Sequence, residues 1–415
     1  MVDPTKPNNK IANPYANLIT STLTGYFIGE PIGYNAEDET MLQELQMLFE
    51  YNDEADENAE LAKNASVYGI AYELLYMEEQ ADPMMGRPML RFKALDPLEC
   101  IPVYDDTIEH NLFCFVRYYT TYDILTDKEL LVVELTTDKE TKRYQATSAS
   151  GSLVFQDAIP HYFGMVPVAI YKNNEETIGD FEPVISLIDA YDVMESDTVN
   201  DFEYFVDAYL ALYGFTAEPE DVRKMKENRV LLMDEGTSAE WLIKNTNDAN
   251  LENMKNRLDR DIHKFSHCPD MSDENFAGNS SGIAIQFKML GTENLISIKE
   301  RKFKKGLQQR LELMAQIQGL LGASFDWRAI DIIFKRNIPT DLSGLADIIN
   351  KLSNIVSTET LLGQLPFVEN IQVELERIRQ EKEENKQNNP FLQDPNMGYK
   401  TDAMEDSEEE EEPID

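Results

Sequence analysis

The sequence predicts an α+β fold in which amphipathic helices precede and follow a β-rich region. Apolar residues recur every three or four positions before residue 69 and again after residue 183, as in helices that bury one face. Between Ile70 and Tyr171 the sequence changes to β-branched and aromatic runs, separated by turns that contain Asp, Gly or Pro. With 415 residues, 42% of them hydrophobic, the chain can bury a substantial core, and we expect two or three substructures.

Three helices are expected before the β-rich region, after an extended segment at residues 1–10. Asn13 is the expected N-cap of the first helix, with Pro14 at its first helical position. Thr40 begins a capping-box pattern for the second helix. The third helix starts in the acid-rich stretch Asp53–Glu60 and ends at Gly69.

The β-rich region contains four strong strand signals. Their content of β-branched and aromatic residues is typical of a half-buried sheet. The predicted strands are Ile70–Met77, Leu112–Tyr119, Glu129–Leu135 and Val166–Tyr171.

A long helix is predicted over Pro183–Tyr213, because its apolar residues keep the three-to-four spacing throughout. At 1.5 Å per residue such a helix spans roughly 45 Å. A short α/β segment follows, with strand patterns at Arg229–Met233 and Ala239–Ile243. Two more helices are expected, over Leu251–Phe265 and from Ile283 to Leu321.

The spacing of apolar residues in the last part of the chain predicts two amphipathic helices, Leu342–Leu362 and Val368–Glu384. Residues 389–415 have the composition of a disordered segment and end in the acidic run Glu408–Glu412.

The charge of the chain is strongly negative, at −40 from 37 Lys+Arg and 77 Asp+Glu. Such a chain repels phosphate groups, so we do not expect a surface that binds DNA tightly or one that binds an anionic membrane. Between Lys172 and Arg223 there are fourteen acids and no Lys or Arg. Two interpretations stay open for this stretch: a solvated acidic face, or a surface that repels a nearby polyanion or meets a basic partner. The acids broadly opposite the apolar stripe of the long helix are Asp189, Asp192, Asp197, Glu203 and Asp207.

The cysteine content and the apolar runs indicate the cellular compartment in which the protein is made. Cys100, Cys114 and Cys268 are too few for a closed disulfide framework, which suits a reducing environment. No N-terminal signal pattern is present, and no uncharged apolar run is long enough to cross a bilayer. We therefore expect a soluble protein made in the cytosol.

Sequence motifs that would indicate catalysis or metal binding are weak in this chain. His263 and His267 are spaced i,i+4 and could offer two imidazoles to a metal, with Asp270 as a third ligand, although helix-end packing is the favoured interpretation. The sequence lacks a P-loop and a nucleophile elbow. One basic cluster suggests a face that pairs with acidic neighbours, with DNA contact as the alternative. Its members are Lys299, Arg301, Lys302, Lys304, Lys305 and Arg310.

The stretch from His267 to Ala284 resembles the portal proteins of tailed bacteriophages, in the Gp6-like family of phages of Gram-positive bacteria. The similarity extends from Asn8 to the region of Glu376 and contains no catalytic signature. Further similar stretches are Asn8–Ile11 with Asn13–Tyr15, His161–Gly164 with Val166–Pro167, Gly179–Pro183, Trp241–Lys244 and Glu300–Phe303.

The resemblance implies a portal-protein fold, assembled as a ring of about twelve copies. Members of this family usually carry additional residues ahead of the stretch that begins at Asn9, so a truncated N-terminus is the expectation here, and the resemblance does not define the outer edge of the wing. The implied divisions are a mixed wing at 1–182, a first stem helix at 183–213, an α/β clip at 214–250, a second stem helix at 251–269, a tunnel loop at 270–281, a long tunnel and wing helix with its connection at 282–338, a helical crown at 339–388 and an acidic tail at 389–415.

The function that the resemblance implies is a DNA conduit at one capsid vertex, for genome packaging and ejection, without enzymatic activity or cofactor. Double-stranded DNA would pass the acidic stem without tight binding, and the partners would be a packaging terminase ATPase, capsid and scaffolding proteins and a head–tail adaptor. The protein would be located in the virion, and in the host cytoplasm during assembly. The implied tunnel-loop residues are Ser272, Glu274, Asn275, Phe276, Asn279 and Ser280, and the implied motor-docking residues of the clip are Lys224, Lys226, Arg229 and Trp241.

Two alternatives remain beside the portal interpretation. One is a non-portal scaffold or assembly protein whose acidic tail binds a basic partner. The other is a metal-dependent hydrolase that uses His263, His267 and Asp270.

Overall fold

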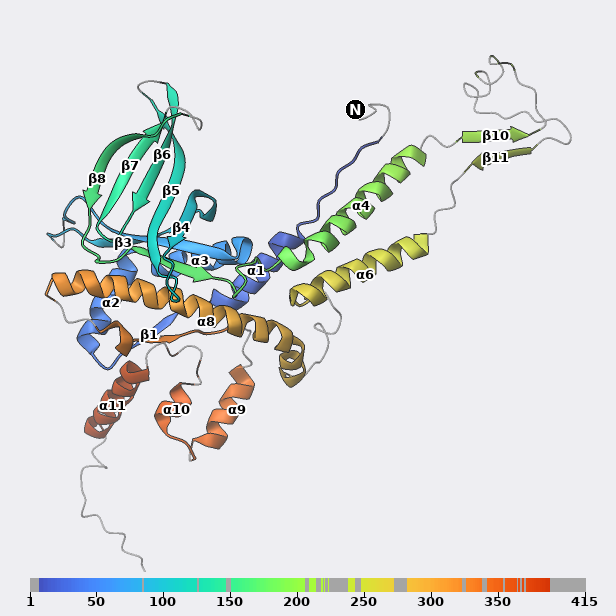
Figure 1. Ribbon diagram of the computed structural model, residues 1–415. Helices are drawn as coiled ribbons and strands as arrows, with labels where there is room; N and C mark the ends of the chain where they lie inside the picture. The colour runs from blue at the N-terminus through green and yellow to red at the C-terminus, as the bar shows by residue number, and fades with distance from the viewer. Residues whose placement is uncertain are drawn as a thin grey trace, which may run out of the picture. The chain divides into compact units, whose positions relative to one another are not determined.

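The computed structural model divides the chain into two compact units, Met1–Ile338 and Pro339–Asp415. It describes residues 7–83, 86–124, 127–146, 151–205, 209–213, 238–242, 248–271, 282–322, 326–337, 342–353, 355–363 and 371–388, together with positions 218, 220, 223, 365 and 368. Helices and antiparallel strands both contribute, so the predicted α+β class is confirmed (Figure 1).

Three helices form the N-terminal layer: α1 (Tyr15–Ile28), α2 (Glu39–Tyr51) and α3 (Glu54–Tyr68). The two predicted N-caps are wrong. Pro14 occupies the N-cap position of α1 without a side-chain hydrogen bond, and Asp38 caps α2 by accepting from the backbone N–H groups of Thr40 and Met41. The end of α3 is as predicted, because Gly69 adopts the left-handed conformation at φ 77° that favours glycine.

Two antiparallel sheets make up the β-rich region. The first has the order β3-β2-β9, from β3 (Leu90–Leu95), β2 (Ile70–Met77) and β9 (Val168–Lys172). The second is a five-stranded meander in chain order; its strands are β4 (Cys100–Tyr104), β5 (Leu112–Asp123), β6 (Lys128–Thr136), β7 (Glu140–Ala146) and β8 (Val154–Pro160). A short pair joins β1 (Gly33–Asn35) to β12 (Asp331–Ile333).

The helix α8 (Gly282–Leu320) has 39 residues and packs along β9 and α1. Its buried Phe303 lies edge-to-face with Phe27 of α1 and tilted against Tyr171 of β9. Gly306 permits this approach, because a Cβ atom there would lie 2.4 Å from Cδ1 of Tyr171. The main core therefore lies between α8, the N-terminal helices and the three-stranded sheet.

Charged groups lie inside this core and are all paired. Arg310 is fully buried, and its guanidinium donates to Glu54 at 3.1 Å, to Glu73 at 2.8 Å and to Asn58 at 2.7 Å. Lys299 forms a buried ion pair with Asp180. Two members of the basic cluster are thus internal, where an unpaired charge would cost several kcal/mol.

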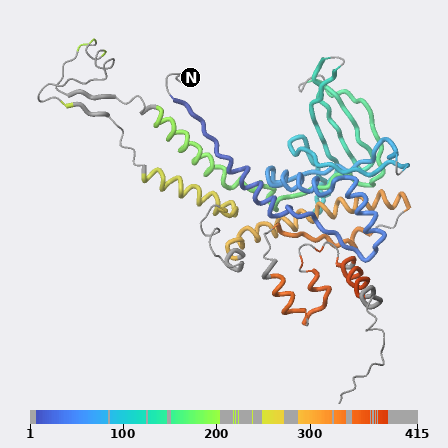
Figure 2. The backbone as a smooth tube through the Cα atoms, turned by 180° about the vertical axis from the view of Figure 1, so that it is seen from behind, coloured from blue at the N-terminus to red at the C-terminus, as the bar shows by residue number. Residues whose placement is uncertain are grey.

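The helices α4 (Ile185–Phe205) and α6 (Asp248–Ser266) run side by side in both views (Figures 1 and 2). The helix predicted to reach Tyr213 is shorter than expected, because Tyr209–Tyr213 forms strand β10 and pairs antiparallel with β11 (Ser238–Leu242). The segment Tyr209–Tyr213 is a short, wholly apolar run, Tyr-Leu-Ala-Leu-Tyr, and periodicity alone cannot distinguish a strand from a helix in such a run. The second predicted strand, Ala239–Ile243, corresponds to β11, whereas Arg229–Met233 lies outside the described residues.

The second unit contains α9 (Leu342–Leu352), α10 (Thr358–Leu362) and α11 (Ile371–Asn388). The helix predicted over 342–362 is therefore divided in two. Ser357 causes the new start, since its side chain accepts from the backbone N–H of Thr360 and caps α10.

Candidate functional site

The pair formed by α4 and α6 carries an uneven distribution of charge. The helix α4 has six acids and no base, whereas α6 has four acids and four bases. Lys255 of α6 is almost fully buried, and its ammonium lies 2.8 Å from Glu195 of α4, a hydrogen bond that raises the pKa of this lysine. One acid of α4 is thus neutralised by its neighbour, and the remaining negative charge of the pair belongs to α4.

The predicted acidic residues of the long helix do not behave alike. Asp189, Asp197 and Glu203 are exposed on α4, as expected. Asp192 is half-buried and accepts two hydrogen bonds of 2.8 Å from Asn13, so its role is partly structural. Asp207 lies outside the described residues.

Apolar side chains interrupt the acidic face of α4. Ile185 and Val193, which are 40% and 59% exposed, fall at the i,i+4 spacing that also contains Asp189 and Asp197. The expectation that acids and apolar residues lie on opposite sides is therefore only partly correct. The exposed stripe of α4 combines negative charge with apolar contact area.

An N-terminal strap, defined here as residues 9–13, lies along α4 and was missed at the sequence level. Asn200 accepts from the backbone N–H of Asn9 at 2.7 Å, and Ser196 accepts from that of Ile11 at 2.9 Å. Asp192 accepts from the backbone of Asn13 in the same way. Two residues of extended chain advance about 6.6 Å and four residues of helix about 6.0 Å, so the donors and acceptors match in spacing.

Most of the other predicted site residues fall outside the described part of the chain. This holds for the tunnel-loop residues and for Lys224, Lys226 and Arg229 of the clip. Trp241 lies in β11, where it is the Cα partner of Leu210 in β10. These assignments remain predictions.

The histidine motif forms a different group from the one expected. Asp259 joins His263 and Asp270, with ligand atoms that all lie within 4.8 Å of one another. His267 adopts a positive φ of 55° and lies against α8, with Nδ1 3.3 Å from the position of a Cβ atom on Gly291. Cys268 is buried, and burial raises the pKa of its thiol to about 11.

The surroundings of Asp259 and His263 connect α6 to α1. The Tyr15 hydroxyl donates to Asp259 at 2.7 Å, and Nδ1 of His263 lies 3.1 Å from the carbonyl oxygen of Cys268. Burial and the bond to Asp259 raise the pKa of Tyr15 well above its ordinary value, so the hydroxyl stays protonated. This arrangement is consistent with the packing interpretation of the motif.

The basic cluster on α8 is distributed over several environments rather than forming one patch. Lys299 and Arg310 are buried, Lys302 pairs with Glu175, and Lys304 donates to the carbonyl of Ile332. The interpretation of a face that pairs with acidic neighbours fits these contacts, which lie within the chain itself.

The comparisons with known proteins decide the family. A family model described as phage portal protein, SPP1 Gp6-like, matches residues 2–388. The chain belongs to the SPP1 Gp6-like phage portal protein family. The portal protein of Bacillus phage SPP1 is 24% identical over 403 residues, which cover 92% of this chain and 78% of the relative. The portal protein of Clostridium phage phiCD119 is 21% identical over 379 residues, which cover 88% and 83%.

Membership of the portal family gives the function of the chain. It is a structural component of phage DNA packaging, forming the conduit for DNA at the capsid vertex, and it is not an enzyme. Neither the metal-dependent hydrolase nor the non-portal assembly protein agrees with this match. None of the helices in the described residues has the length and apolar character that a bilayer crossing requires.

Proposed function

We propose that copies of this chain assemble into a closed ring and that the exposed stripe of α4 borders the passage for DNA. In this arrangement α4 and α6 form the stem, residues 214–250 the clip, residues 270–281 the tunnel loop and residues 339–388 the crown. The resemblance to portal proteins implies about twelve copies in the ring, and contacts between two different surfaces of each subunit would close such a cyclic assembly.

The observation that carries the proposal is that α4 has six acids without a base. DNA that must slide should meet few cations, since each phosphate contact adds affinity and salt dependence. Acidic side chains at physiological salt repel phosphates over about 8 Å, the Debye length. An acidic stripe repeated around a ring therefore centres the duplex instead of holding it.

The remaining partners follow from the same assembly. A packaging terminase ATPase docks at the clip, with Lys224, Lys226, Arg229 and Trp241 as contacts, and supplies the energy. The tunnel loop, with Ser272, Glu274, Asn275, Phe276, Asn279 and Ser280, narrows the passage. Capsid and scaffolding proteins and a head–tail adaptor contact the outer parts of the ring, which resides at the portal vertex of the virion and assembles in the host cytoplasm.

The proposal is tested by measuring the mass of the purified full-length chain and imaging it by electron microscopy. The expected result is a closed ring whose mass is an integer multiple of the 47.6 kDa subunit. A strictly monomeric chain across protein and salt concentrations would contradict the proposal.

A further inference from the structure

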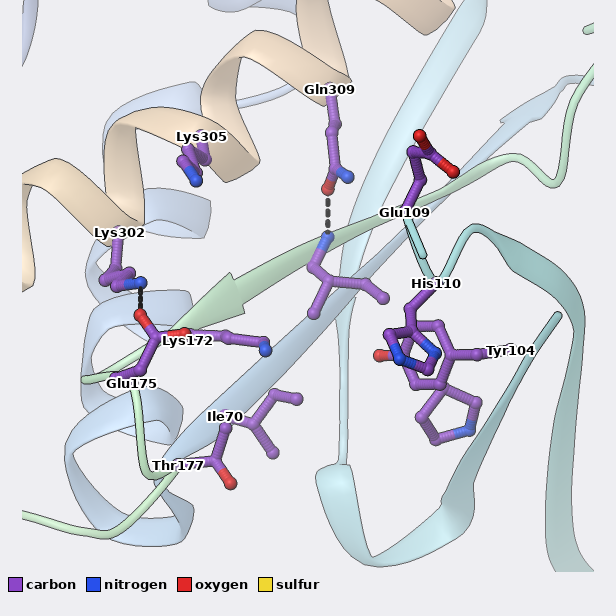
Figure 3. A pocket seen from close by; sticks show the side chains of 12 residues that line it. Ile70, Tyr104, Glu109, His110, Lys172, Glu175, Thr177, Lys302, Lys305 and Gln309 are labelled. Carbon is purple, nitrogen blue, oxygen red and sulfur yellow. Dashed lines mark hydrogen bonds and ion pairs between the residues drawn. The ribbon is translucent and has the colours of Figure 1, made fainter. Parts of the chain in front are cut away.

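A cavity of about 620 Å³ opens between α8, the end of β9 and the loop that joins β4 to β5. Figure 3 shows that Lys302, Lys305 and Gln309 enter the cavity from α8 and that Lys172 enters it from the end of β9. The opposite wall comes from Tyr104 at the end of β4 and from Glu109 and His110 of the β4–β5 loop, as Figure 3 also shows.

The cavity concentrates positive charge. Lys302 pairs with Glu175, but within the described residues neither Lys172 nor Lys305 forms an ion pair. Burial and the charges of Lys305 and Lys172 lower the pKa of Lys302, which agrees with three ammonium groups in one place. In a chain of 77 acids and 37 bases, this cavity brings three lysines together with only two glutamates, Glu109 and Glu175.

The loop beside the cavity is ordered and presents an apolar tip. Asp105 accepts from the Thr107 hydroxyl at 2.6 Å and from the backbone N–H of Asn111 at 2.9 Å. These bonds lower the pKa of Asp105, and they hold Ile108 at the tip of the loop with 96% of its surface exposed. An exposed isoleucine next to a cationic cavity is typical of a protein interface with an apolar contact and a charged pair.

We propose that this cavity receives an Asp or Glu side chain of the adjoining copy of the chain in the ring. The inference rests on the proposed function, because it requires a ring. Copies with a charge of −40 repel one another, and a cationic cavity in each copy offsets that repulsion at the point of contact.

A carboxylate of a second copy fits the site better than a DNA phosphate does. Glu109 and Glu175 line the same cavity and would repel a phosphate backbone that passes its mouth. A carboxylate side chain carries a single charge on a narrow group, so we expect it to be repelled less than a row of phosphates and to pair with Lys172 and Lys305. Ile108 then contacts an apolar part of the same neighbour.

The first experiment identifies the partner directly. Rings are assembled from equal parts of ¹⁵N-labelled and unlabelled full-length chain and treated with a carbodiimide, which joins an amine to a carboxylate only when the two are in contact. The expected product is a peptide pair that joins Lys172 or Lys305 to an acidic residue, with one labelled and one unlabelled member. Links found only between members with the same label would overturn the inference.

The second experiment measures ring formation by light scattering for the variant Lys172→Met/Lys305→Met. The expected result is about a tenfold rise in the subunit concentration at which half of the protein is in rings, with a weaker dependence on salt. The control is Lys63→Met/Lys128→Met, which removes two exposed lysines that do not line the cavity and should leave the midpoint unchanged.

The outcomes separate this inference from the proposed function. If the wild-type chain forms no ring, the proposed function is wrong and the inference falls with it. If rings of the Lys172→Met/Lys305→Met variant form as readily as wild-type rings, the inference alone is wrong. Normal rings of this variant that have lost a salt-dependent retention of DNA would identify the occupant as a phosphate, and would also overturn the inference.

Discussion

At the scale of single residues, the stability of the core depends on buried cations that are neutralised by buried carboxylates. The guanidinium of Arg310 lies 4.5 Å from the centre of the Phe92 ring and donates to Glu54 and Glu73. Arg310→Met would leave these two carboxylates buried without a counter-charge. We expect a loss of about 3–5 kcal/mol in the free energy of unfolding, measured by urea denaturation.

Arg301 on the same helix provides the control, because it is exposed and, within the described residues, its guanidinium donates only to the carbonyl of Ser297. Arg301→Met should change the free energy of unfolding by less than about 0.5 kcal/mol. Equal effects of the two substitutions would show that the buried network contributes nothing specific.

Glu293 gives a second residue-scale prediction, on pH. Burial alone would raise its pKa, but hydrogen bonds from Arg336 and Tyr26 outweigh burial and hold the pKa below the ordinary value. Because the folded pKa is lower than the unfolded one, the contribution to stability is complete above about pH 4.3 and is lost as the pH falls through the folded pKa. Glu293→Gln should therefore be less stable than wild type near neutral pH, and the difference should disappear in acid.

Urea midpoints measured from about pH 7 to about pH 3 test this expectation. Glu129→Gln is a suitable control, since Glu129 is exposed on β6. A difference between Glu293→Gln and wild type that stays constant over this range would contradict the assigned pKa direction.

At the scale of elements, α4 is the helix whose composition suits a DNA passage. Asp189→Asn/Asp197→Asn/Glu203→Gln removes three exposed charges and keeps the helix nearly isosteric. We expect rings of this variant to retain DNA more strongly than wild-type rings at low salt, because repulsion of the phosphates is reduced. The measurement is the fraction of linear DNA that stays ring-bound as salt increases.

The matched control removes the same charge elsewhere in the first unit. Glu37→Gln/Glu50→Gln/Glu129→Gln changes three exposed acids that lie outside α4. If both triple variants retain DNA equally, the increased retention results from the change in net charge, and the result would contradict the proposal that α4 borders the DNA passage.

At the scale of the whole molecule, the match to the portal family ends at residue 388 and the acidic tail lies beyond it. Deletion of Asp402–Asp415 removes much acidic charge without touching the matched part of the chain. We expect rings to form as in wild type, measured by mass and electron microscopy. Loss of the ring on this deletion would instead assign an assembly role to the tail.

The sequence predicted local patterns well and partners poorly. The strand Ile70–Met77 and the end of α3 at Gly69 follow from residues within a few positions of each other, and both are confirmed. The buried state of Arg310 was missed because its partner Glu54 lies 256 positions away in the chain. Asp192 was assigned to solvent for the same reason, since only the fold brings Asn13 beside it.

The strap also sets a rule for changes of chain length near the N-terminus. Its odd-numbered residues are half-buried and bonded to α4, while residues 10 and 12 are exposed. Insertion of one residue between Asn9 and Ile11 would turn the side chain of Asn9 away from α4. Insertion of two residues would turn it back toward α4, about one helical turn beyond its present partner. Natural or engineered variants of this segment should therefore tolerate length differences of two better than differences of one, and the thermal stability of single- and double-insertion chains would show this parity.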